Sequence, residues 1–181
     1  MRVISGTAKG RRLVTKPGEE TRPTIDRVKE AVFSMLQNRI YASRVLDLFA
    51  GSGALGIEAL SRGSGHCVFV ENSKLALDVA RRNAELAKVE DRVLTVLSDA
   101  VSYVERSSEK FDIIFLDPPY NTGLLNGAIK KIAEKGLLSE TGIIVAESAV
   151  GGEEPDCESF DIIRSAKYGK TAVFVLRARR T

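Results

Sequence analysis

The sequence predicts one α/β domain with a mostly parallel, seven-stranded sheet. Three observations support this fold class. Through most of the chain, apolar segments of strand length alternate with segments of helix length, and this pattern favours parallel strands joined by helical crossovers. Residues 160–180 instead contain two strand-like runs around Gly169 with no helix between them, which predicts a terminal antiparallel hairpin. The first 40 residues precede the alternation and are typical of a β-hairpin followed by a helix.

The N-terminal segment comes first in this order. Residues 2–15 contain two short β-like runs separated by glycines, which predicts the hairpin. Pro23 then breaks the chain, and Thr24 or Asp26 is expected to cap a helix. The apolar face of this helix contains Val28, Val32, Phe33, Leu36 and Ile40. We therefore divide the chain into an N-terminal extension, residues 1–40, and a core, residues 41–181.

Within the core, the alternation is regular. The predicted strands cover residues 44–50, 66–71, 92–98 and 142–148, together with a strand that starts at Phe111 and stops before Asp117. The predicted helices between them cover residues 54–63, 74–89, 100–107 and 127–136. A parallel sheet with helices on both faces is the expected result.

Composition limits the function classes. The chain has 181 residues, of which 44% are hydrophobic and 28% charged, so one domain can bury a substantial core. No apolar run approaches the roughly 20 residues that span a bilayer, and no apolar signal-peptide core follows the first basic residues. We therefore expect a cytoplasmic protein without membrane contact. Separately, we expect a monomer. Cys67, Cys157 and the single His66 lack metal-ligand or redox spacing, so we expect neither a metal site nor a disulfide.

The charges are segregated along the chain. Residues 1–29 carry a net charge of +5 and residues 164–181 a net charge of +6, whereas the segment between them carries −8. Basic ends are often only solvated tails. A basic surface separated from an acidic body is also what binding to a phosphate backbone requires.

A glycine-rich turn joins the first core strand to its helix. Gly51, Gly53 and Gly56 match the G-x-G-x-x-G spacing of dinucleotide-binding folds, which alone is weak evidence. Asp47 stands in the strand just before this turn, where a carboxylate repels a pyrophosphate and attracts a cation. Glu71 ends the second strand, where acids accept ribose hydroxyls, and Asp99 follows the third. Together the three acids favour a positively charged nucleoside without phosphate.

The segment "DPPY", residues 117–120, ends the fourth strand. It can be a rigid turn and nothing more. It can also be a fixed set of hydrogen-bond acceptors with an aromatic lid, because prolines stiffen the chain and leave its carbonyls free. Such a site suits a planar group that carries an NH2.

These motifs resemble those of the S-adenosylmethionine-dependent methyltransferases. "LDLFAGSGALGIEAL", "FVEN" and "LSDA" are similar to their cofactor motifs, and "DPPY" to the amino-methyltransferase signature. "MRVISGTAKGRRL" with "RPTIDRVKEAVFSML" resembles the RsmD family, which methylates guanine N2 in small-subunit ribosomal RNA. The likeness covers nearly the whole chain. It implies a Rossmann-like class I methyltransferase fold, and as partner small-subunit (16S) ribosomal RNA or an assembling subunit.

The resemblance also implies roles for particular residues. The catalytic segment would be Asp117, Pro118, Pro119 and Tyr120. The S-adenosylmethionine site would be formed by Asp47, Phe49, Ala50, Gly51, Ser52, Gly53, Glu71, Asn72, Asp99 and Ala100. RNA would bind to Arg2, Lys9, Arg11, Arg12 and Arg22.

In this interpretation, Asp117 and the Pro118 carbonyl accept the two hydrogens of an exocyclic amine, and its lone pair then faces the methyl group. Tyr120 stacks on the base, which must be unpaired or leave its helix. Three alternatives remain: a DNA adenine- or cytosine-amino methyltransferase, an enzyme that methylates a protein glutamine, and an RNA-binding assembly factor without turnover.

Overall fold

A computed structural model describes residues 1–15 and 23–179 of the chain, with side chains from residue 26 onward in the second range. The helices are α1 (Pro23–Leu36), α2 (Ala54–Ser61), α3 (Lys74–Ala87), α4 (Ala100–Arg106) and α5 (Leu124–Lys135), with a short 3-10 turn η1 (Glu90–Arg92). The strands are β1 (Arg44–Asp47), β2 (His66–Glu71), β3 (Val93–Leu97), β4 (Phe111–Leu116), β5 (Leu138–Ala149), β6 (Phe160–Tyr168) and β7 (Thr171–Ala178).

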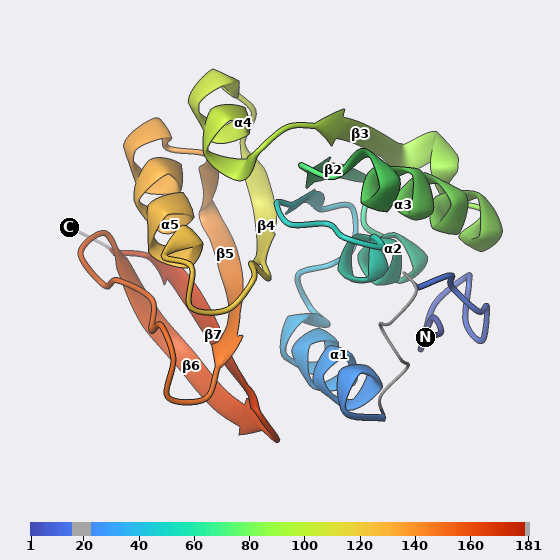
Figure 1. Ribbon diagram of the computed structural model, residues 1–181, viewed down its shortest axis with the longest axis horizontal. Coiled ribbons are helices and arrows are strands. Elements are labelled where there is room, and N and C mark those ends of the chain that lie inside the picture. Colours follow the sequence, from blue (N-terminus) through green and yellow to red (C-terminus); the bar gives the residue numbers. More distant parts are fainter. Residues whose placement is uncertain (16–22, 180–181) are drawn as a thin grey trace.

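All seven strands form one sheet in the order β3-β2-β1-β4-β5-β7-β6 (Figure 1). The first five strands in this order are parallel to one another, whereas β7 runs antiparallel to both β5 and β6. This confirms the predicted sheet and its terminal hairpin. The strand order also reverses direction at β1 and β4, and ligands of open α/β sheets bind at such a switch point, beyond the carboxyl ends of the strands.

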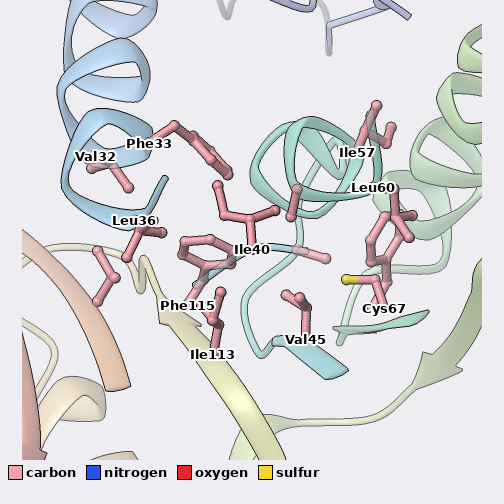
Figure 2. Packing of buried hydrophobic residues seen from close by; sticks show 14 of the residues in the cluster. Val32, Phe33, Leu36, Ile40, Val45, Ile57, Leu60, Cys67, Ile113 and Phe115 are labelled. Atoms are coloured by element: carbon pink, nitrogen blue, oxygen red, sulfur yellow. The ribbon is translucent and has the colours of Figure 1, made fainter. Parts of the chain in front are cut away.

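Helices cover both faces of the sheet, because β1, β2, β4 and β5 are apolar on both sides. One buried cluster joins one sheet face to α1, α2 and α3, and a second joins the other face to α4 and α5. The five apolar residues predicted for the first helix all belong to the first cluster. Figure 2 shows that Phe33 lies towards Phe115 there, with ring centroids 5.7 Å apart. We call this side the α1 face.

The N-terminal hairpin is shorter than predicted. Only Arg2 and Arg12 form an antiparallel bridge, supported by hydrogen bonds from the Val3 amide to the Arg11 carbonyl (2.9 Å) and from the Leu13 amide to the Met1 carbonyl (2.9 Å). Most of the segment's remaining backbone groups bond within tight turns or to side chains of the core, so the two runs do not become strands.

Several element boundaries were also predicted wrongly. Helix α1 ends at Leu36, before Ile40, and β1 ends at Asp47 instead of residue 50. The first helix begins at Pro23, as proline favours the first helical position, so Thr24 and Asp26 lie inside the helix and cannot be its cap. Helix α5 begins at Leu124, after Gly123 with φ 73°, and β5 already begins at Leu138. Apolar periodicity missed the last two starts because Leu124 is exposed and the polar residues 139–141 separate Leu138 from the buried run of β5.

Among the residues that the structure describes, no helix is long and apolar enough to cross a membrane. Cys67 is buried and Cys157 half-buried, and both are free thiols. The division into residues 1–40 and 41–181 stays a prediction, although apolar side chains of both parts share one cluster.

Candidate active site

A cavity of about 720 Å³ opens at the carboxyl ends of β1, β2, β4 and β5. One wall is the turn after β1 together with the ends of β2 and β3, and the opposite wall is residues 117–120 after β4. Helix α1 contributes Val28 and Lys29, the N-terminal segment Met1, and the start of β7 Thr171. The cavity therefore lies at the switch point of the sheet and is closed on one side by the N-terminal extension.

Nearly every residue predicted for the cofactor site lies around this cavity. Gly53 is the exception, because it lines no part of the cavity and instead caps α2 with φ 79°. A Cβ atom at Gly53 would approach the Phe69 ring to 2.8 Å, so packing requires glycine there. Gly51, with φ 54°, lines the cavity and has open space where its Cβ would stand, so a ligand can approach the backbone at this turn.

Asp47 is the most deeply buried acid of the cavity. Its residue is 1% exposed, and its Oδ2 accepts a hydrogen bond from the Gly56 amide at 3.1 Å. Burial raises the pKa of Asp47 to about 7; the Gly56 hydrogen bond opposes this rise, and the charges of Asp117 and Glu71 add to it. A cation in the cavity would lower this pKa again, because it favours the carboxylate.

Glu71 holds the glycine turn in place. Its Oε2 accepts from the Gly51 amide and its Oε1 from the Ser73 amide, both at 2.9 Å. Each carboxylate oxygen keeps a further lone pair for a ligand hydroxyl. Asn72 follows at the rim of the cavity.

Asp99 has a structural role in addition to its place at the cavity. It caps α4, where its Oδ1 accepts from the Ser102 amide at 2.9 Å. The hydrogen bonds from Ser102 hold the pKa of Asp99 below its ordinary value. The neighbouring Ala100 also lines the cavity, so this segment forms the wall beyond Glu71.

Residues 117–120 form the opposite wall. Tyr120 is 42% exposed, and its hydroxyl lies 3.3 Å from Thr171 Oγ1. The Thr122 hydroxyl donates to the Pro119 carbonyl at 2.8 Å, which fixes the turn. Burial raises the pKa of the Tyr120 phenol, and the charges of Asp117 and Glu147 contribute. The tyrosine thus stands at the open edge of the cavity, close to two acids.

Sequence reasoning missed Glu147, which lies near the end of β5 and lines the cavity. A signal was present, since Glu147 ends the apolar part of its strand just as Asp47 and Glu71 end theirs. It also missed Thr171 and the buried pair of Lys29 with Glu58, which have no recognisable spacing.

That pair anchors the N-terminal segment. Glu58 Oε2 accepts from the Ile4 amide (2.9 Å) and Oε1 from the Ser5 amide (3.0 Å). Lys29 Nζ lies 3.3 Å from Glu58 Oε2 and donates to the Arg2 carbonyl at 2.6 Å. Burial lowers the pKa of Lys29, and Glu58 partly compensates. A buried pair satisfied in this way fixes geometry.

The basic residues predicted to bind RNA are not equivalent. Arg2, Lys9 and Arg12 are exposed. Arg11 is half-buried and donates to the Leu86 carbonyl at the end of α3, at 2.7 Å. Arg22 lies outside the described residues.

Comparison with known proteins finds relatives that match nearly the whole chain. Residues 1–177 match the family described as Conserved hypothetical protein 95. The putative rRNA methyltransferase YlbH of Bacillus subtilis is 40% identical over 184 residues, which cover 99% of this chain and 100% of the relative. Ribosomal RNA small subunit methyltransferase D of Escherichia coli is 35% identical over 150 residues, or 83% of this chain and 75% of the relative.

A solved structure, described as putative methyltransferase yhhF from Escherichia coli, superposes with a TM-score of 0.89 at 30% identity and covers 99% of this chain and 98% of that one. The putative methylase HI0767 from Haemophilus influenzae does so with a TM-score of 0.84 at 27% identity, covering 99% of both chains. The expected Rossmann-like class I methyltransferase fold is confirmed. Similarity of this extent shows that the chain belongs to the Conserved hypothetical protein 95 family, the RsmD-type methyltransferases.

Proposed function

We propose that this methyltransferase transfers a methyl group from S-adenosylmethionine to the exocyclic N2 of a guanine in small-subunit ribosomal RNA. The RNA class comes from the relatives, because those of Escherichia coli and Haemophilus influenzae are named ribosomal RNA small subunit methyltransferase D. The guanine N2 comes from the family resemblance of the N-terminal motifs. A ribosomal substrate would place the enzyme in the cytoplasm.

One observation carries the proposal: residues 117–120 and the glycine turn with its acids line opposite walls of a single cavity. A methyl donor and an amine can therefore meet there.

The chemistry of the lining fits S-adenosylmethionine. Among the residues that the structure describes, the carboxyl groups along the cavity outnumber the single lysine, Lys29, which is already paired with Glu58. The carboxyl groups are those of Asp47, Glu71, Asp99, Asp117 and Glu147. Such a lining favours a cation and disfavours a pyrophosphate. When bound, the cofactor supplies an electrophilic methyl group on a positively charged sulfur. Glu71 and the segment at Asp99 and Ala100 would hold its ribose and adenine.

The protein's own part is to bind and orient the amine. The lone pair of a conjugated amine is delocalised into its ring, so the amine needs placement to react. Asp117 and the Pro118 carbonyl would accept its hydrogens, and Tyr120, exposed at the rim, offers its ring to the base. The exposed basic residues of the N-terminal extension would bind the phosphate backbone near the same opening.

The decisive experiment is transfer of labelled methyl from S-adenosylmethionine to total RNA of cells that lack this protein, followed by identification of the modified nucleoside. Naked RNA and small ribosomal subunits are offered in parallel. Labelled N2-methylguanosine in small-subunit RNA is the expected result. Label in DNA or in a protein glutamine would assign a different substrate, and cofactor binding without transfer to any of them would favour the assembly factor.

A further inference from the structure

Glu147 is a buried carboxyl group that lines the cavity. The proposed function assigns it no individual role. It belongs to β5 and is 8% exposed. Its strand lies between β4, which leads into residues 117–120, and β7, which begins at Thr171.

The register of the sheet places Glu147 beside Asp117. Leu116 of β4 pairs with Ala146 of β5, and Asp117 and Glu147 are the next residues after this pair. Because side chains alternate along a strand, both continue the rows of Phe115 and Val145, which point to the α1 face. Asp47 continues the row of Val45 on the same face. Asp117 and Glu147 thus stand side by side, and Asp47, which pairs with Phe115, lies one inward-facing position behind them on the same face.

The surroundings of Glu147 disfavour its charge. Burial raises its pKa well above the ordinary value, and the charges of Asp117 and Asp47 raise it further. Among the described residues, the Tyr120 hydroxyl also interacts with Glu147, and Lys29 of α1 lines the same cavity. Lys29 is 3.3 Å from Glu58, so its charge is already compensated. Adjacent carboxyl groups of this kind titrate as a unit and hold one proton tightly.

We propose that Asp117 and Glu147 act as one carboxyl pair that takes up the proton released by methyl transfer. Asp117 contacts the amine, and Glu147 is the positioning residue that allows Asp117 to keep the proton. This inference rests on the proposed function.

The step balances as follows. The amine nitrogen forms a bond to the methyl carbon while the carbon–sulfur bond breaks and leaves its electron pair on the sulfur. The nitrogen is then positively charged, and one of its protons passes to Asp117 while the N–H electron pair returns to nitrogen. Before the step, the cofactor's positive charge favours the ionised pair; after it, that charge is gone and the pair binds a proton more tightly. The proton reaches water when the product leaves.

The first test measures single-turnover methyl transfer to small-subunit RNA from cells lacking the protein, from about pH 6 to about pH 9. Glu147→Gln should lower the rate by roughly 100-fold, at the lower end of proton-transfer contributions, and shift the pH profile. Glu147→Asp keeps a carboxyl group and should recover part of the rate. Glu140→Gln removes an exposed charge from the same strand and should change nothing. A Glu147→Gln variant with the unmodified rate and profile would overturn the proposal.

The second test needs no RNA. Calorimetry in buffers of different ionisation enthalpy counts the protons exchanged when S-adenosylmethionine or S-adenosylhomocysteine binds; these ligands differ by one methyl group and its charge. The cation should release more protons near pH 7, and Glu147→Gln should reduce that difference. An undiminished difference would contradict the carboxyl pair even if the unmodified protein methylates guanine N2. Conversely, a reduced difference without any RNA methylation would support the pair and reject only the proposed function.

Melting curves exclude a folding defect. The raised pKa of Glu147 makes its ionised form costly in the folded state above the unfolded pKa of about 4.3. Glu147→Gln should therefore melt no lower than the unmodified protein near pH 8, with the gain fading towards about pH 4. A lower melting temperature near pH 8 would contradict this assignment.

Discussion

The two walls of the cavity differ in how they hold their functional groups. On the wall formed by β1, β2 and β3, each acid accepts hydrogen bonds from backbone amides: Asp47 from Gly56, Glu71 from Gly51 and Ser73, and Asp99 from Ser102. On the opposite wall, Tyr120 is 42% exposed and contacts Thr171 through its hydroxyl. The acids of the first wall are therefore fixed by the backbone, whereas the second wall exposes its tyrosine to solvent.

The largest effect should come from Asp117→Ala on the open wall. Loss of one charged acceptor at a reacting centre typically costs about two to three orders of magnitude in rate, while cofactor affinity should stay nearly intact. Asp117→Asn keeps one acceptor oxygen and should retain partial activity. Methylation rate and melting temperature are measured on the same preparations. A stable, fully active Asp117→Ala enzyme would end the proposed role of this residue.

Tyr120→Ala should weaken base binding by roughly 1–3 kcal/mol, the usual contribution of one stacking contact. Tyr120→Phe keeps the ring, loses only the contact to Thr171, and should be mild. The affinity for a short single-stranded RNA separates the two variants. Equal losses for both would assign the effect to the hydroxyl contact instead of stacking.

Glu71→Ala should weaken S-adenosylmethionine at least tenfold, since hydrogen bonds to charged groups contribute about 1.5–3 kcal/mol. The variant also deprives the Gly51 and Ser73 amides of their acceptor, so the turn should loosen. Calorimetry on Glu85→Ala, an exposed position in α3, provides the control. Unchanged affinity would remove Glu71 from the site.

The pKa of Asp47, about 7, predicts a pH-dependent affinity. A bound cation favours the carboxylate, so binding below that pKa must release a proton. Affinity for S-adenosylmethionine should therefore rise between about pH 6 and about pH 8, by at most tenfold per pH unit for one proton. Asp47→Asn should flatten this dependence. The same raised pKa means that, without ligand, Asp47 lowers stability increasingly as the pH rises from about 4 to about 7. Affinity that falls with pH would contradict the assignment.

The smallest effect is expected from the basic N-terminal segment. Replacing Arg11 and Arg12 by alanine should lower RNA affinity and reduce the salt slope by at most about 1.4, or about 0.7 per lost contact to single-stranded phosphate. Cofactor binding should survive. Because Arg11 also binds the Leu86 carbonyl, Arg12→Ala alone isolates the charge effect, and Lys130→Ala on α5 is the control. An unchanged salt slope would show that Arg11 and Arg12 are solvated and do not contact the RNA phosphates.

Much of this arrangement could be predicted from local signals. The strand–helix alternation predicted the parallel part of the sheet. The two strand-like runs around Gly169, with no helix between them, predicted the antiparallel hairpin. Acids directly after apolar strands located Asp47, Glu71 and Asp117 at one edge, because the carboxyl ends of parallel strands meet there. Glu147 had the same signal but no known motif beside it.

Other features depend on contacts between distant segments. Glu58 lies in an apolar helix, and only the folded chain brings it to the amides of Ile4 and Ser5, more than 50 residues away. The role of Gly53 likewise depends on the Phe69 ring. No periodicity encodes such partners.

The N-terminal segment is anchored to the core by several side chains, and this limits its replacement by the corresponding segment of a related protein. The amide of Ala8 donates to Ser61 Oγ (2.9 Å) and that of Val14 to Asn83 Oδ1 (2.7 Å), in addition to the two amides held by Glu58. A transplanted segment would have to present the same amides to these three side chains, or Glu58 would keep only its contacts with Lys29 and Arg62. The segment therefore cannot be grafted as a separate module, and it must be inherited together with the side chains of α2 and α3 that hold it.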